Sequence, residues 1–89
     1  MTREEAKKVA LKSTRNEMEK YGKTLDDVCI MSPKAGKDNW TFREVIGAIE
    51  NDTDLEDCKD SNPIDSIIRY ENYRIKRGLP SLVDTFLKK

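Results

Sequence analysis

The sequence contains no histidine, the commonest general base and the commonest metal ligand of proteins. A Ser-His-Asp or Cys-His catalytic set therefore cannot form within this chain. The cofactor and phosphate-binding patterns GxGxxG, GxxxxGK[ST], HExxH and CxxC are absent as well. A chain of 89 residues also has no room for a separate catalytic domain. We therefore expect a protein that is not an enzyme and carries no cofactor.

Cysteine is scarce, and long apolar runs are missing. Cys29 and Cys58 are too few for a secreted disulfide scaffold, and without histidine they are too few for a closed zinc site. We expect both thiols to be reduced, structurally minor and not bound to metal. No apolar run approaches the roughly 20 residues of a membrane span, and the charged N-terminus lacks the apolar stretch of a signal peptide. These features favour a cytoplasmic protein without a membrane partner.

Charge is abundant but balanced, with 17 basic and 17 acidic residues. Disorder by composition requires few large apolar residues together with a strong net charge. Here the net charge is zero, and large apolar residues recur along the whole chain. We therefore expect residues 1–89 to fold as one small domain.

Helix-start signals are the clearest local pattern. A capping box places Ser or Thr at the N-cap and an acidic residue three positions later, so that both satisfy free backbone N–H groups. The pattern occurs at Thr2/Glu5, Thr24/Asp27, Thr41/Glu44, Thr53/Glu56 and Ser81/Asp84. Asn62 followed by Pro63 is a sixth start, with Pro at the first helical position. Gly22 and Gly78 each follow a basic stretch and indicate where two helices end.

These signals predict helices over about 3–21, 25–31, 42–50, 63–77 and 82–88, with a single helical turn within 53–59. Segment 32–39 is the clearest loop, and strand signals are nearly absent. The predicted fold class is therefore all-α, a compact irregular bundle of four to five helices.

Helical periodicity assigns a buried face to each predicted helix. The predicted core positions are Ala6, Val9, Ala10, Leu11, Met18 and Tyr21; Phe42, Val45, Ile46 and Ile49; Ile64, Ile67, Ile68 and Ile75; and Leu82, Val83, Phe86 and Leu87. Trp40 and Val45 have the spacing of a hydrophobic staple, which predicts that Trp40 fixes the preceding loop onto the helix. Glu71 interrupts the isoleucine stripe. We expect the helix to leave the core there, with Glu71 at the rim; a basic partner is the alternative.

The face opposite that stripe carries the strongest functional candidate. It combines tyrosine and arginine at spacings of three and four, with Lys76 at its edge, and we call it the Arg/Tyr face: Arg69, Tyr70, Tyr73, Arg74 and Arg77. Such a face can offer cation–π stacking and bidentate guanidinium contacts to carboxylates or phosphates. It also fits an ordinary solvated helix end, where cations complement the helix dipole and each tyrosine stacks on an arginine of its own helix.

Charge is segregated along the chain. Residues 1–23 hold seven bases and four acids, residues 38–68 two bases and nine acids, and residues 69–89 six bases and two acids. The corresponding net charges are +3, −7 and +4. Folding can pair the basic ends with the acidic middle, or it can leave opposite patches that steer charged partners. The sequence leaves this open.

Together these features favour a small interaction protein that regulates or adapts a protein partner. The Arg/Tyr face predicts a partner with an acidic or phosphorylated surface. The alternative is an oligomer that binds an anionic small ligand, such as a nucleotide, where several Arg/Tyr faces converge. Zero net charge and the acidic middle argue against nucleic-acid binding, because phosphate contacts dominate such affinity.

Overall fold

The chain forms four α-helices in the computed structural model, which describes residues 1–29, 40–55 and 61–87. The helices are α1 (Arg3–Tyr21), α2 (Phe42–Asn51), α3 (Pro63–Lys76) and α4 (Leu82–Phe86). The predicted all-α class is confirmed as a compact single domain of four helices in the described part of the chain. None of these helices combines the length and the apolar character that crossing a membrane requires, as far as the described residues go.

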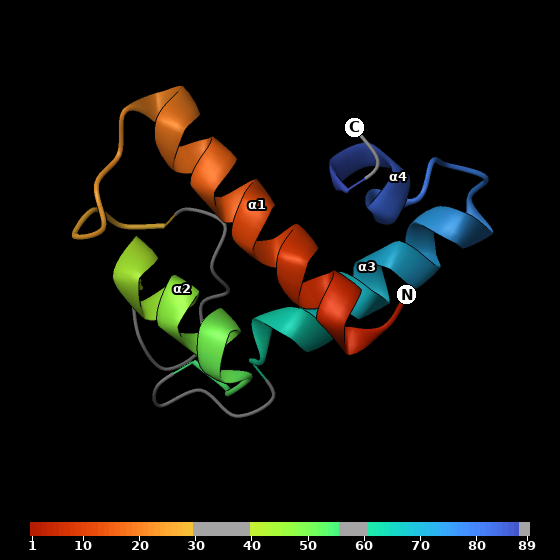
Figure 1. The fold of residues 1–89 in the computed structure, drawn as a ribbon, viewed down its shortest axis with the longest axis horizontal. Helices are drawn as coiled ribbons and strands as arrows, with labels where there is room; N and C mark the ends of the chain where they lie inside the picture. Colours follow the sequence, from red (N-terminus) through yellow and green to blue (C-terminus); the bar gives the residue numbers. More distant parts are fainter. Residues whose placement is uncertain (30–39, 56–60, 88–89) are drawn as a thin grey trace.

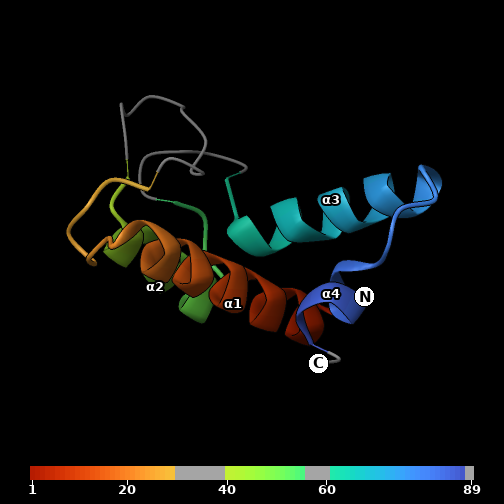
Figure 2. The same cartoon turned by 90° about the horizontal axis from the view of Figure 1, so that it is seen from above.

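The longest helix, α1, lies in the middle of the arrangement and packs against each of the other three. Figure 1 shows α2 on one side of α1, with α3 and α4 toward the other side. In Figure 2, which is seen from above, α3 runs alongside α1 in a separate layer, and α4 lies beside the N-terminal end of α1. Because α2 and α3 also touch, three helices enclose the core.

Capping groups fix most helix boundaries where the sequence placed them. In the box of α1, the Thr2 amide donates to Glu5 Oε1 at 2.9 Å and the Glu5 amide donates to Thr2 Oγ1 at 3.1 Å. The Thr41/Glu44 box of α2 is reciprocal in the same way. Asn62 Oδ1 accepts from the amides of Ile64 and Asp65 at the start of α3. These local contacts confirm the predicted starts at residues 3, 42 and 63.

The helix expected over 25–31 is absent from the described residues, which end here at Cys29. The residues around Leu25 form a turn, in which the Thr24 amide donates to Asp27 Oδ2 at 2.7 Å. The carbonyls that a helix would use internally accept tertiary hydrogen bonds instead: Asp27 O from the Phe42 amide at 3.0 Å, and Leu25 O from the Arg43 amide at 2.9 Å. Tertiary pairing with the start of α2 therefore replaces helix formation, and Val28 and Thr41 form an isolated antiparallel β-bridge.

Other boundaries differ less. Residues 53–55 are not helical, so a turn within 53–59 is not formed in its described part, and 56–59 lie outside the described residues. The last helix ends at Phe86, and residue 88 also lies outside the described range. The left-handed glycine caps are confirmed, with φ of 63° at Gly22 and 71° at Gly78.

The core consists mainly of the predicted apolar positions. Its largest fully buried side chains are Trp40, Phe42, Ile49, Ile64 and Val9. Trp40 and Val45 both belong to this core, in accord with the predicted hydrophobic staple. Tyr21 is a wrong prediction: its side chain is 54% exposed. Tyr21 is the last residue of α1, and no other helix of the described structure covers its side chain.

The isoleucine stripe of α3 ends earlier than predicted. Ile64 is buried and Ile67 and Ile68 pack against the core, but Ile75 is 57% exposed, so its assignment to the core was wrong. The expected rim position of Glu71 was also wrong, because its side chain is only 2% exposed. The helix does not leave the core at Glu71, because the first residues of α4 contact its carboxylate.

Candidate functional site

The Arg/Tyr face lies on the C-terminal half of α3. Tyr70 and Tyr73 are each 49% exposed, and Arg69 and Arg77 are also exposed, while Arg74 is half-buried. The isoleucine side of the same helix packs on α1 and α2, which directs the opposite side outward. All five predicted residues therefore belong to one surface.

Aromatic rings and guanidinium groups stack in a row along this surface. The rings of Tyr70 and Tyr73 lie 6.3 Å apart at an interplanar angle of 14°. The Arg74 guanidinium lies 5.6 Å from the centre of the Tyr70 ring, and the Arg77 guanidinium lies 4.9 Å from that of Tyr73. The row is thus a chain of contacts that links Arg74 to Tyr70, Tyr70 to Tyr73 and Tyr73 to Arg77, and each cation lies within the range of a cation–π contact.

Two arginines of the face also make hydrogen bonds. Arg74 Nε donates to the Pro80 carbonyl at 2.9 Å, which ties the end of α3 to the following turn, and Arg74 Nη1 donates to Tyr70 Oη at 3.4 Å. Arg69 Nη2 donates to Ser66 Oγ at 3.3 Å. Within the described ranges none of the cations on this half of α3 forms an ion pair. Their charges are therefore oriented but not neutralised by a carboxylate there.

The basic N-terminal segment behaves differently. The Arg3 guanidinium binds the carboxylates of Asp52 and Asp65, the latter at 2.6 Å. Lys7 Nζ donates to the Glu50 carbonyl at 2.8 Å. The pKa of Asp52 is lowered from its ordinary value, first by the hydrogen bond from Arg3 and then by the Asn62 amide. Of the two basic ends, the N-terminal one thus pairs with the acidic middle in the described structure.

Glu71 holds the start of α4. Its Oε2 accepts from Ser81 Oγ at 2.7 Å, and its Oε1 accepts from the Leu82 amide at 2.9 Å. Ser81 is the N-cap of α4, so the buried carboxylate meets a helix N-terminus rather than a basic side chain. The sequence predicted either a position at the rim of the core or a basic partner for Glu71. It did not predict a contact with a helix N-terminus eleven residues later.

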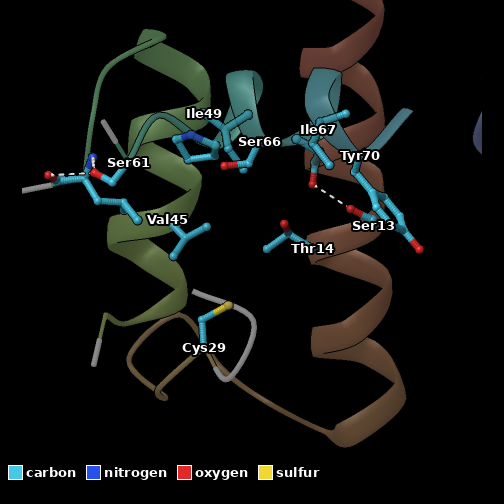
Figure 3. Close-up of a pocket in the computed structure, with 12 residues that line it drawn as sticks. Ser13, Thr14, Cys29, Val45, Ile49, Ser61, Ser66, Ile67 and Tyr70 are labelled. Atoms are coloured by element: carbon cyan, nitrogen blue, oxygen red, sulfur yellow. Dashed lines mark hydrogen bonds between the residues drawn. The ribbon is translucent and has the colours of Figure 1, made fainter. Parts of the chain in front are cut away.

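A cavity of about 320 Å³ lies between α1, α2 and α3 (Figure 3). It is lined by Ala10, Ser13, Thr14, Cys29, Val45, Ile49, Leu55, Ser61, Pro63, Ser66, Ile67 and Tyr70. Tyr70 therefore has one side at this cavity and the other on the Arg/Tyr face. Sequence reasoning missed the cavity, because no single helix encodes it; the one local signal was a polar Thr14 within the buried side of α1.

The expectation that the two cysteines bind no metal can be compared with the structure only within the described residues. Among the described residues no three acidic or cysteine side chains gather where a metal ion could bind. Cys29 is 2% exposed, belongs to the core and lines the cavity, so the expectation of a structurally minor residue does not fit it. Cys58 lies outside the described residues.

Comparisons with protein-family models, curated proteins and solved structures yielded no match to this chain.

Proposed function

We propose that this protein acts by binding, as a stoichiometric regulator or adaptor, and that its Arg/Tyr face receives an acidic or phosphorylated segment of a protein partner. The observation that supports this most is the stacked row from Arg74 to Arg77, with arginines that have no ion-pair partner among the described residues. The row lies on the solvent-facing side of α3, and the opposite side of α3 packs against α1 and α2.

Preorganisation of the side chains favours binding at this face. Stacking on Tyr70 and Tyr73 already restricts the guanidinium groups, so a partner would order fewer freely rotating side chains on binding. A guanidinium presents a planar fork that matches carboxylate and phosphate oxygens. Tyrosine and arginine are also the residue types enriched at energetic hot spots of interfaces, whereas an ordinary solvated face favours lysine and glutamate.

A second basic surface provides a comparison within the same molecule. Lys8, Lys12 and Arg15 on α1 flank a shallow groove that Leu87 also lines. No tyrosine lines this groove. Because lysine is depleted at interface centres, we place the binding site on α3 rather than on α1.

The test compares two charge reversals of equal size. Arg69→Glu/Arg77→Glu alters the face while sparing Arg74, whose bond to the Pro80 carbonyl supports the turn. Lys8→Glu/Lys12→Glu is the matched control on α1. The probe is a short peptide with two phosphoserines between acidic residues, compared with its Ser/Asn/Gln counterpart by fluorescence anisotropy. We expect the α3 variant to bind the phosphopeptide at least about tenfold more weakly, about 1.4 kcal/mol, and the α1 variant to bind like wild type.

Two further measurements test the assignment: the salt dependence of peptide binding, and cross-linking to partners in the native host. Binding should weaken as ionic strength rises, because exposed charges are screened. A partner cross-linked in the native host should be recovered with wild type and with the α1 variant, but not with the α3 variant. Equal binding by both folded variants, checked by circular dichroism, would contradict the assignment. An anionic small molecule retained by an oligomer in native mass spectrometry would favour the alternative function.

A further inference from the structure

The cavity between α1, α2 and α3 has a polar group without a partner in an otherwise mostly apolar wall. Thr14 is only 7% exposed, lies on the side of α1 that faces the other helices, and lines the cavity (Figure 3). Among the described residues its hydroxyl forms no hydrogen bond. The neighbouring Ser13 shows the usual alternative, since its Oγ donates to the Ala10 carbonyl of the same helix at 3.2 Å. A hydroxyl that lines an apolar wall and forms no hydrogen bond with the described residues can donate to, or accept from, a polar group bound in the cavity.

We propose that this cavity binds a neutral, largely apolar small molecule, with Thr14 as the hydrogen-bonding contact to its one polar group. This cavity is a different site from the Arg/Tyr face, although Tyr70 borders both.

The lining residues define the class of ligand. Ala10, Val45, Ile49, Leu55 and Ile67 supply apolar surface from several elements, and none of the described residues that line the cavity carries a charge. A charged ligand would lose its hydration here without a counter-ion among these residues. Apolar pockets with a few placed polar groups are typical of small-molecule sites, and helix bundles often hold them between their helices.

The volume sets the size of the ligand. An engineered apolar cavity of about 150 Å³ holds one benzene molecule. The cavity of about 320 Å³ is about twice as large, which suits a molecule with two fused rings or a chain of similar bulk. The matched probes are 1-naphthol and 1-methylnaphthalene, which share their shape and differ in the hydroxyl group.

The experiment follows both probes by NMR chemical shifts of the backbone amides in the full chain. We expect 1-naphthol to bind with a dissociation constant on the order of 0.1 mM and to shift amides near Thr14 and Ile67. Thr14→Val keeps the side-chain shape but removes the hydroxyl. It should weaken 1-naphthol about fivefold while changing 1-methylnaphthalene less than about twofold.

A second variant, at Ser66 on α3, fills part of the cavity with a larger side chain. Ser66→Leu should remove most binding of both probes, because its larger side chain occupies part of the volume. Ser66 is half-buried on α3, and circular dichroism checks that the variant stays helical. The proposal is wrong if neither probe shifts the wild-type amides at about 1 mM, a concentration well above the expected dissociation constant. It is equally wrong if folded Thr14→Val and Ser66→Leu proteins bind both probes like wild type.

Discussion

At the scale of single residues, Glu71 shows how a buried carboxylate is held by a hydroxyl and a backbone amide, without a basic side chain among the described residues. Both oxygens accept hydrogen bonds, from the Ser81 hydroxyl and from the Leu82 amide. The amide belongs to the first residue of α4, where backbone N–H groups have no partner within the helix and the helix dipole is positive. The carboxylate thus satisfies the start of α4, and α4 in turn covers the carboxylate. This contact positions the turn that carries Pro80, to which Arg74 binds.

We predict that Glu71→Ala destabilises the protein by about 2–3 kcal/mol, because the Leu82 amide and the Ser81 hydroxyl would lose a charged acceptor in a buried place. The matched control is the exposed neighbour Asn72→Ala, which should stay within about 0.5 kcal/mol of wild type. Urea unfolding followed by circular dichroism measures both. Equal midpoints for wild type and Glu71→Ala would mean that these hydrogen bonds do not hold α4 in solution.

At the scale of elements, one arginine joins three helices. Arg3 lies in the first turn of α1, Asp52 is the C-cap of α2, and Asp65 lies in the first turn of α3. The guanidinium contacts both carboxylates, and Asn62 Nδ2 adds a hydrogen bond to Asp52 at 2.9 Å. The hydrogen bonds from Arg3 and Asn62 favour the charged form of Asp52, so its pKa in the folded state lies below the ordinary value.

This lowered pKa predicts a specific acid response. An aspartate whose pKa is depressed by folding contributes stability that is present above its unfolded pKa, about 3.9, and is lost as the pH falls through the folded pKa. The stability difference between wild type and Arg3→Gln should therefore be constant from about pH 7 to 5 and should narrow below about pH 4. Urea midpoints across this range measure it. Arg43→Gln, which removes the more exposed pair with Asp26, should show a much smaller difference throughout. If the stability difference between wild type and Arg3→Gln stayed constant down to the lowest pH, the contact with Arg3 would not be what lowers the pKa of Asp52.

The sequence predicted those parts of the elements that depend on local chemistry. The Thr2/Glu5 box and the Asn62-Pro63 start lie within a few residues of the helices they begin, so their pattern was sufficient. The segment after Thr24 carries a similar local signal, but its Asp27 carbonyl accepts a hydrogen bond from α2, and this tertiary contact prevailed over helix formation.

Helical periodicity could not predict features that depend on how separate helices lie relative to one another. The helical wheel assigned a direction to Tyr21 and Ile75 but could not say how far the neighbouring helices extend, and both side chains are exposed. The arrangement of the Arg/Tyr face was predicted because all its members share one helix. The cavity at Thr14 was not, because it depends on how three helices and the residues beside them lie relative to one another.

At the scale of the whole molecule, the two basic ends of a neutral chain have different surroundings. Arg3 and Lys7 bind groups of the acidic middle, as the charge pattern allowed. In the described structure Arg74 and Arg77, at the end of α3, have no such partner and stack on Tyr70 and Tyr73 instead. The positive charge at one end thus contributes to internal cohesion, and at the other end it is directed toward solvent. We infer that the two ends serve stability and binding separately.

This separation predicts opposite effects for two substitutions of the same chemical kind. Arg3→Gln should lower the urea midpoint, because two carboxylates lose their guanidinium, while affinity for the phosphopeptide stays within about twofold of wild type. Arg77→Gln should leave the midpoint nearly unchanged, since the contact that its guanidinium makes among the described residues is with an exposed ring, while affinity falls at least about threefold. The double variant should show the sum of both effects, because the two residues share no partner. If Arg3→Gln weakened binding as much as Arg77→Gln does, the phosphopeptide would be responding to overall charge rather than to the Arg/Tyr face. The stacked row on α3 would then lose its assigned role.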